Sequence, residues 1–176
     1  MSEQPQHRGG VSINKMAFAW LLLSLLIVVL DFWTKQIATD SLTLYRPVEV
    51  TSWLNMTLAH NYGAAFSFLS DAGGWQRWLF TILAAVVTVI LIVWMFRLQA
   101  KEKLTAAALG LIIGGALGNL IDRIINGYVV DFIDVFYRDW HWPAFNVADS
   151  AITGGVILLL LDALLQTLAE RKTGAD

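Results

Sequence analysis

The stretch Leu104-Thr-Ala-Ala-Ala-Leu-Gly-Leu-Ile-Ile-Gly-Gly-Ala-Leu-Gly-Asn-Leu-Ile121 contains no charged residue over 18 positions. A helix of this length can cross the hydrocarbon core of a bilayer, which takes about 17–25 residues. Within it, glycine recurs every four positions at Gly110, Gly114 and Gly118, with Gly115 beside them. One face of the helix therefore lacks side chains, which lets a neighbouring helix approach closely. The stretch predicts a membrane-spanning helix that packs against other helices.

Three further segments have the composition of membrane spans. Trp78–Phe96 is uncharged over 19 residues, and another apolar segment runs from near Asn146 to Ala169. Met16–Leu30 is uncharged over only 15 residues, so its helix must continue to Lys35 to cross the bilayer. A cleaved signal peptide is the alternative for this segment, but no small-x-small cleavage site follows it. We predict four transmembrane helices, at about residues 16–36, 76–96, 104–124 and 146–168.

The composition of the whole chain indicates that lipid surrounds most of it. Of the 176 residues, 57% are hydrophobic and 15% are charged, and the mean hydropathy is +0.60. These values are too apolar for a soluble domain of this length. The net charge of −2 gives no indication of a nucleic-acid partner. Because the chain has no cysteine, disulfides, thiolate catalysis and thiolate metal sites are excluded.

The basic residues predict the orientation in the membrane. Most of them precede the first span, fill the connection between the second and third spans, or follow the fourth: His7, Arg8 and Lys15; Arg97, Lys101 and Lys103; Arg171 and Lys172. In the two longer connections, acidic residues balance Arg46, Arg77 and Arg138. By the positive-inside rule the first three regions are cytoplasmic, so both termini lie inside a bacterial inner membrane and residues 39–75 and 124–146 face the periplasm. We expect a disordered tail at 1–15, one transmembrane domain at 16–170 and a second cytoplasmic tail at 171–176.

The first periplasmic connection has a strand pattern. Val48–Leu58 is rich in β-branched residues and partly alternates between apolar and polar ones, as in a small sheet on the membrane surface. The edge of such a sheet can bind an extended peptide. The predicted fold class is an all-α membrane protein of four transmembrane helices, with a small periplasmic β-sheet element between helices 1 and 2.

Polar residues gather where the predicted spans reach the periplasmic side. The candidates at this level are Asp31, Asn119, Asp122, Arg123, Asp131, Asn146 and Asp149. Charges within spans cost about 2.5–3.5 kcal/mol each on insertion, so these residues are functional candidates. Structural alternatives stay open, because Asp122 and Arg123 can form an interfacial ion pair that ends the third helix. Likewise, Asp149 can be a carboxylate stabilised by the helix dipole, with Asn146 as the N-cap.

Three other acidic residues fit structural roles. Asp134 and Asp139 are expected to be solvated loop acids. Asp162 lies about 20 Å from Asp149 along the fourth helix, toward the cytoplasmic end. We expect Asp162 either to contact a neighbouring helix or to extend its side chain to the membrane surface.

Two carboxylates remain as the basis of a catalytic mechanism. His60 and His141 have no metal-ligand spacing, and no serine has a Lys or His at a suggestive distance in the sequence. Asp131 and Asp149 lie on separate segments that converge at the periplasmic interface. Two such groups about 3 Å apart in a low dielectric share one proton, as in aspartic peptidases. This mechanism needs no cofactor and no metal.

The sequence resembles the lipoprotein signal peptidases (signal peptidase II) over nearly all of the chain after residue 15. Five blocks carry the likeness: Asp31-Phe-Trp-Thr-Lys35, Asn61-Tyr-Gly-Ala-Ala-Phe-Ser67, Gly115-Ala-Leu-Gly-Asn-Leu-Ile-Asp-Arg123, Val129-Val-Asp-Phe-Ile-Asp134 and Phe145-Asn-Val-Ala-Asp-Ser150. The resemblance implies a catalytic dyad of Asp131 and Asp149. It also implies a site shaped by Asn61, Asn119, Arg123 and Asn146 and supported by Asp31 and Asp122.

The resemblance further implies the substrate and the partners. Prolipoproteins whose lipobox cysteine carries a diacylglyceryl group would be cut on the N-terminal side of that cysteine, by an enzyme that we expect to act as a monomer among membrane lipids. Two rival functions stay open. A small proton-coupled transporter also has short helices with membrane carboxylates, although it would place its acid near the midplane. A non-catalytic assembly factor would tolerate Asp→Asn at both positions.

Overall fold

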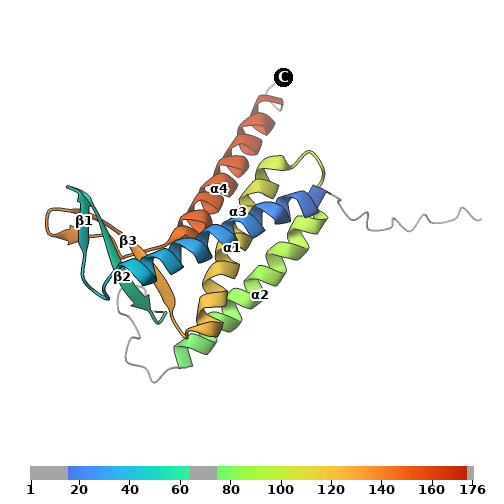
Figure 1. Ribbon diagram of the computed structural model, residues 1–176. Helices are drawn as coiled ribbons and strands as arrows, with labels where there is room; N and C mark the ends of the chain where they lie inside the picture. Colours follow the sequence, from blue (N-terminus) through green and yellow to red (C-terminus); the bar gives the residue numbers. More distant parts are fainter. Residues whose placement is uncertain (1–15, 64–74, 174–176) are drawn as a thin grey trace, which may run out of the picture.

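The computed structural model describes residues 16–63 and 75–173. Short strands lie between the first and second described helices and between the third and fourth (Figure 1). In chain order the elements are α1 (Met16–Ser41), β1 (Val48–Thr51), β2 (Leu54–Asn61), α2 (Trp75–Arg97), α3 (Lys103–Ile125), β3 (Val129–Tyr137), β4 (Trp140–His141) and α4 (Val147–Thr173). The predicted tail at 1–15 lies outside the described residues.

All four helices are long and apolar enough to cross a membrane. α1 continues to Ser41, beyond the predicted end near residue 36. α4 continues to Thr173, so the first residues of the predicted C-terminal tail are still helical. α1, α2 and α4 expose large apolar side chains over much of their length, whereas α3 is mostly buried. α3 is therefore the central helix, in contact with each of the others.

The glycines of α3 allow these close contacts. A Cβ atom at Gly114 would lie 2.8 Å from the Ser24 carbonyl oxygen of α1. On α4, a Cβ at Gly155 would lie 2.7 Å from the Ala108 carbonyl oxygen of α3. The Ser24 hydroxyl also donates a hydrogen bond of 2.8 Å to the carbonyl oxygen of Gly110. The close helix approach predicted from the glycine spacing is confirmed.

The strands form one antiparallel sheet in the order β1-β2-β3-β4. The sequence predicted strands only between the first two helices, but half of the strands come from the connection between α3 and α4. β3 was missed because residues on both of its faces are buried, so it lacks the apolar–polar alternation that marks a strand exposed on one side. The β2–β3 register places Asn61 opposite Val129 and Ala59 opposite Asp131.

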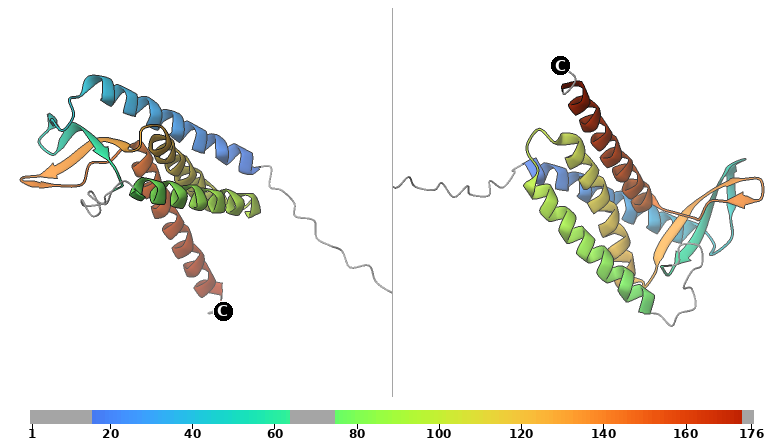
Figure 2. Two further views of the ribbon diagram at one scale, coloured as in Figure 1. Left: turned by 90° about the horizontal axis from the view of Figure 1, so that it is seen from below. Right: turned by 180° about the vertical axis from the view of Figure 1, so that it is seen from behind.

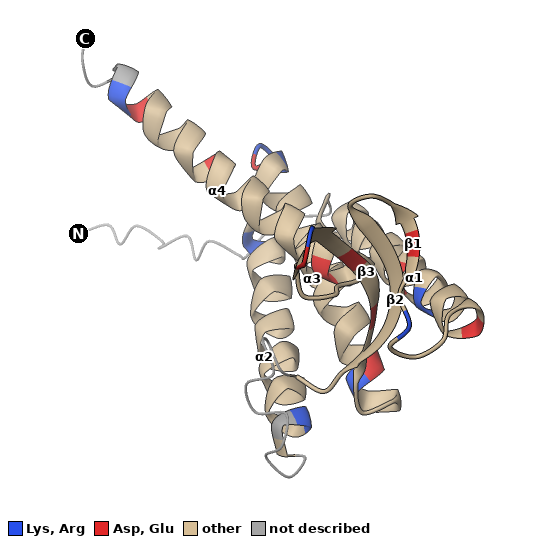
Figure 3. Ribbon diagram, turned by 90° about the vertical axis from the view of Figure 1, so that its left-hand side faces the viewer, with Lys and Arg blue, Asp and Glu red and all other residues tan. Residues whose placement is uncertain are grey.

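The sheet lies at one end of the helices, where α1 and α3 end and α2 and α4 begin (Figure 2). We call this the sheet end. The opposite end, with the α2–α3 connection at residues 98–102, is the loop end. Charged residues lie mainly at these two ends and on the sheet, and the stretches between are largely uncharged (Figure 3). The sheet end is the junction at which the polar site residues meet.

Candidate active site

Asp131 lies on β3 with a side chain that is nearly inaccessible, at 2% exposure. Its Oδ2 accepts a hydrogen bond of 3.0 Å from Asn61 Nδ2 on β2, and its Oδ1 accepts one of 2.7 Å from Asn146 Nδ2. Asn61 is itself oriented, because its Oδ1 accepts the backbone N–H of Gly63 at 2.9 Å. Both oxygens of the Asp131 carboxyl group are thus held by amide side chains from neighbouring elements.

Asp149 lies in the first turn of α4 and takes part in capping that helix. Asn146 Oδ1 accepts the Asp149 N–H at 2.9 Å, and Asp149 Oδ2 accepts the Asn146 N–H at 3.3 Å. This reciprocal pair is a capping box, and Asn146 is the N-cap that the sequence predicted. The Asn146 side chain is fully buried. The residue that begins α4 therefore contacts both Asp131 and Asp149.

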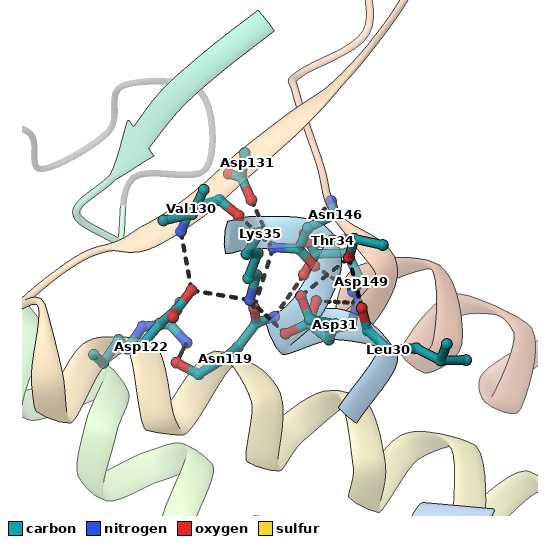
Figure 4. A network of polar contacts seen from close by, with 12 residues as sticks. Leu30, Asp31, Thr34, Lys35, Asn119, Asp122, Val130, Asp131, Asn146 and Asp149 are labelled. Carbon is teal, nitrogen blue, oxygen red and sulfur yellow. Dashed lines mark hydrogen bonds and ion pairs between the residues drawn. The ribbon is translucent and has the colours of Figure 1, made fainter. Parts of the chain in front are cut away.

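Asn119 on α3 orients Asp149 and connects it to a buried charge (Figure 4). Its Nδ2 donates to Asp149 Oδ1 at 2.7 Å. Its Oδ1 accepts hydrogen bonds from Asn146 Nδ2 at 3.2 Å and from Lys35 Nζ at 3.1 Å. Since both ends of the amide have fixed partners, the donor that faces Asp149 cannot rotate away without losing the bond to Lys35.

Lys35 on α1 is buried between two carboxylates. Its Nζ lies 2.6 Å from Asp31 Oδ2 and 2.9 Å from Asp122 Oδ2. Asp31 Oδ1 also accepts the Ala148 N–H at 2.9 Å, which fixes the first turn of α4. Asp122 Oδ2 accepts the Val130 N–H at 3.1 Å, which fixes the start of β3. This charge cluster, defined as Lys35, Asp31 and Asp122, therefore anchors the two elements that carry Asp131 and Asp149.

Lys35 was not among the site residues predicted from the sequence. The available signal was its position four residues after Asp31, a spacing that brings two side chains together on a helix. The alternative of an ion pair between Asp122 and Arg123 is not found among the described residues, and Asp122 pairs with Lys35 instead. The physical reason is that adjacent residues on a helix point in different directions.

Arg123 lies beside the carboxyl groups without neutralising either of them. Its Nη1 makes a long hydrogen bond of 3.4 Å to the Asn119 carbonyl oxygen. Among the described residues, its guanidinium group forms no ion pair. A partly buried positive charge next to two carboxyl groups is thus left with donors to spare.

The environment of Asp131 changes its acidity. Burial, and after it the negative charge of Asp149, raise the pKa of Asp131 from 3.8 to about 7. The hydrogen bonds from Asn61 and Asn146 and the charge of Lys35 act in the opposite direction but do not outweigh burial. Near neutral pH the Asp131 carboxyl group therefore carries a proton for much of the time. The pair can supply one acid and one base at once.

Asp134 is not the solvated loop acid that the sequence predicted. It lies on β3 with 6% exposure. Its Oδ2 accepts a bond of 3.0 Å from Asn55 Nδ2 on β2, and His141 Nδ1 lies 2.8 Å from its Oδ1. The reason is the missed strand, which carries Asp134 into the sheet rather than into a loop. By contrast Asp139, in the turn after β3, is exposed as predicted.

Asp162 and His60 complete the candidates. Asp162 Oδ2 accepts hydrogen bonds from the Thr105 hydroxyl of α3 and, at 3.0 Å, from Gln166 Nε2. It therefore makes the predicted helix contact. His60 stacks on Tyr128 with ring centroids 3.8 Å apart. Within the described part of the chain, no group of three or more His, Cys, Asp or Glu residues is arranged to hold a metal ion.

Four helices able to span a membrane, with a pair of carboxyl groups held where the helices meet a sheet, define a membrane-embedded enzyme. Solved structures support this class. One described as a bacterial membrane enzyme has a TM-score of 0.76 and 34% sequence identity, covering 88% of this chain and 93% of that chain. A second with the same description has a TM-score of 0.74 and 34% identity, covering 86% and 96%.

Sequence comparison gives the family. The family model described as signal peptidase (SPase) II matches residues 23–165. A lipoprotein signal peptidase of Acinetobacter baumannii is 61% identical over 143 residues, which cover 81% of each chain. Another, of Teredinibacter turnerae, is 52% identical over 151 residues, covering 86% of this chain and 90% of the relative. The chain belongs to the signal peptidase II family and is a peptidase with several membrane-spanning helices.

Proposed function

We propose that this protein removes the signal peptides of diacylglyceryl-modified prolipoproteins, with Asp131 and Asp149 as the catalytic pair. The observation that carries the proposal is the shared contact through Asn146. One side chain orients the Asp131 carboxyl group, and the same residue caps the helix turn that carries Asp149. Two carboxyl groups from distant parts of the chain are thereby held in one site, and the pKa of one of them is about 7.

The two carboxyl groups divide the chemistry between them. Asp131 is nearly inaccessible and holds the proton, whereas Asp149 is only partly buried and can reach water. Asp149 accepts a proton from a water molecule as the water oxygen bonds to the peptide carbonyl carbon. Asp131 donates its proton to the carbonyl oxygen, which gives a tetrahedral diol.

The second half of the reaction returns both groups to their starting states. The diol collapses as the C–N bond breaks, and Asp149 gives its proton to the leaving nitrogen, which becomes the amino group of the lipidated cysteine. Asp131 takes back a proton from the diol as the new carboxyl group forms. Water is consumed, and no other reactant is required.

The neighbouring residues orient these groups and the substrate. Asn61 and Asn119 each donate to one carboxyl oxygen, so they fix the planes of the two groups. The charge cluster holds Asn119 and the first turn of α4 in place. Arg123 has free donors beside the pair, so we assign it to a carbonyl group of the substrate backbone.

The orientation and the substrate are consistent with each other. We propose that both termini are cytoplasmic and that the sheet end faces the periplasm across a bacterial inner membrane, because the basic residues gather at the loop end and beyond it. A diacylglyceryl cysteine anchors the C-terminal end of an apolar signal helix at the outer leaflet. The scissile bond would then meet the carboxyl pair at the depth where α3 ends. We further propose that one chain suffices for activity.

The test is the replacement of each carboxyl group by an amide. Asp131→Asn and Asp149→Asn should each reduce cleavage of a diacylglyceryl-modified precursor by several orders of magnitude, while the precursor still binds, because the amide cannot exchange the proton. The double variant should be little worse than either single one, as expected for groups that act as a unit.

The matched control is Asp139→Asn. This exposed acid lies in the turn after the same strand, and its replacement should leave activity near the wild-type rate. Asp134 does not serve as a control, because its carboxylate is buried and bonded within the sheet. Near wild-type cleavage by a folded Asp131→Asn or Asp149→Asn protein would refute the assignment.

A further inference from the structure

A cavity with many polar residues lies at the loop end, remote from the carboxyl pair. It has a volume of about 550 Å³ and lies between the α2–α3 connection and the C-terminal part of α4. Its lining includes Lys101, Glu102, Lys103, Asp162 and Glu170. Asp162 is about 20 Å from Asp149 along α4. We call it the loop-end cavity; the peptidase chemistry does not use it.

The two walls of the loop-end cavity differ in charge: lysines outnumber the one acid, Glu102, on the first wall, and the second has only acids among its charged residues. The Glu102 carboxylate accepts the backbone N–H of Gln99. Lys101 and Lys103 lie on the wall formed by the connection and the start of α3, and neither ammonium group forms an ion pair with a described residue. Asp162 lies on the α4 wall. Both of its hydrogen bonds go to Oδ2, and among the described residues none goes to Oδ1. An acceptor and two cationic donors therefore remain available to an occupant.

The face of α4 that packs against α3 becomes polar where it reaches this cavity. Toward the sheet end, Gly155 packs against the backbone of Ala108 on α3. About two and three turns further on, the same face carries Asp162 and Gln166, which line the cavity. The opposite face stays apolar and exposed, as at Leu160 with 67% and Leu164 with 54%. α4 therefore has a lipid-facing side, and a polar side that α3 covers only in part.

The depth of the cavity matches the membrane surface. The Thr105 hydroxyl donates to Asp162, so Asp162 is level with the start of α3, two residues beyond Lys103. α3 has no charged residue from Leu104 to Ile121, a length of about 27 Å that nearly equals the hydrocarbon thickness of a bilayer. The cavity thus opens at the level where phospholipid headgroups begin.

We propose that the loop-end cavity binds the headgroup of a zwitterionic phospholipid, with the phosphate between Lys101 and Lys103 and the ammonium group at Asp162. A headgroup of this kind has one negative and one positive charge a few bonds apart, which complements the two walls. α3 begins at the same wall without a side-chain cap, so its positive end also favours the phosphate. The acyl chains would lie along the exposed apolar face of α4.

The charge arrangement selects this ligand over simpler ones. An anionic lipid without an ammonium group would satisfy the lysines but would place no positive charge at Asp162; the hydroxyls of a glycerol headgroup offer only neutral donors. Water would bring no charge to either wall. In the orientation proposed above, the lipid belongs to the cytoplasmic leaflet. The ligand chemistry itself does not depend on that orientation or on the peptidase activity.

The test is lipid binding to the purified, delipidated full-length protein in detergent, measured by native mass spectrometry. Phosphatidylethanolamine and phosphatidylglycerol are titrated separately. Lys101→Gln should weaken binding of both lipids about tenfold, the loss expected for one charge-assisted hydrogen bond. Asp162→Asn, which keeps an acceptor for Thr105, should weaken only phosphatidylethanolamine, also about tenfold.

Arg97→Gln is the matched control, because Arg97 is an exposed basic residue at the same end that does not line the cavity. Its lipid affinities should equal those of the wild type. The proposal is wrong if Lys101→Gln and Asp162→Asn bind both lipids as Arg97→Gln does. It is also wrong if soluble glycerophosphoethanolamine binds as tightly as the lipid, since the ligand would then be a free phosphate ester. No peptide substrate is present, so failure here leaves the peptidase assignment untouched.

Discussion

Burial is the main cause of the raised pKa of Asp131. The amide donors of Asn61 and Asn146 stabilise the ionised carboxylate, yet burial and the charge of Asp149 still raise its pKa to about 7. A solvated aspartate would be ionised at neutral pH and could not donate a proton to a carbonyl oxygen. At the scale of one residue, the proposed mechanism therefore depends on keeping water away from Asp131.

This pKa predicts the alkaline side of the pH profile. If Asp131 must be protonated, kcat should be constant below its pKa and should fall about tenfold per pH unit above pH 7. The measurement is cleavage of a lipidated precursor at saturating concentration across pH 6–9. Asp139→Asn should show the same profile, which separates the effect of the site from that of general surface charge. A rate that stays flat to pH 9 would contradict the assigned role of Asp131.

At the scale of elements, the packing of α3 against α4 places Asp149. A Cβ atom at Gly115 would overlap the Ala148 carbonyl group and lie 2.8 Å from the Ile152 side chain. Gly154 on α4 has nothing within 4 Å of the same added atom. Two glycines on helices in contact therefore differ in whether they tolerate a methyl group.

Gly115→Ala should lower both stability and activity, because it pushes the first turn of α4 away from Asn119. Overpacking of this kind costs about 1–3 kcal/mol. Thermal unfolding in detergent, followed by tryptophan fluorescence, should give a lower Tm than wild type. Gly154→Ala is the control and should leave Tm unchanged or slightly raised, since alanine favours a helix by up to about 1 kcal/mol. Equal Tm values for the two variants would show that the close contact is not needed.

At the scale of the whole molecule, both termini and the loop end are expected on one side of the membrane. Because the chain has no native cysteine, single-cysteine variants test this directly. Ser52→Cys, in the exposed β1–β2 turn, should react with a membrane-impermeant thiol reagent in intact cells. Gln99→Cys, at the loop end, should react only after the cells are permeabilised. The reverse pattern would mean that the orientation is inverted.

The sequence predicted the helices better than the sheet, for physical reasons. A membrane span must be long, uncharged and complete within one segment, so composition alone locates it. β3 is buried on both faces, so its sequence lacks the alternation of a half-exposed strand. Its partner β2 is separated from it in the chain by both α2 and α3, so the two strands are not recognisable as a hairpin. The mistaken view of Asp134 as a solvated acid followed from missing this strand.

The same contrast holds within the site. Asp131, Asn146 and Asp149 could be predicted because polar residues at the end of an apolar segment are conspicuous. The role of Lys35 depends on partners that are far away in the chain, such as Asn119 and Asp122. Such contacts follow from how the helices pack, which the order of residues within one helix does not specify.

Asn146 and Asp149 each have a structural role in α4 and a place in the carboxyl site, which affects how resistance to an inhibitor can arise. Each of these residues caps α4 and also holds or forms part of the carboxyl site. A substitution that lets the protein escape an inhibitor bound to either residue would also uncap the helix, at a cost of about 0.5–2 kcal/mol. Escape mutations should therefore arise in the residues around the inhibitor, and seldom at the two residues on which the helix and the proposed chemistry both depend.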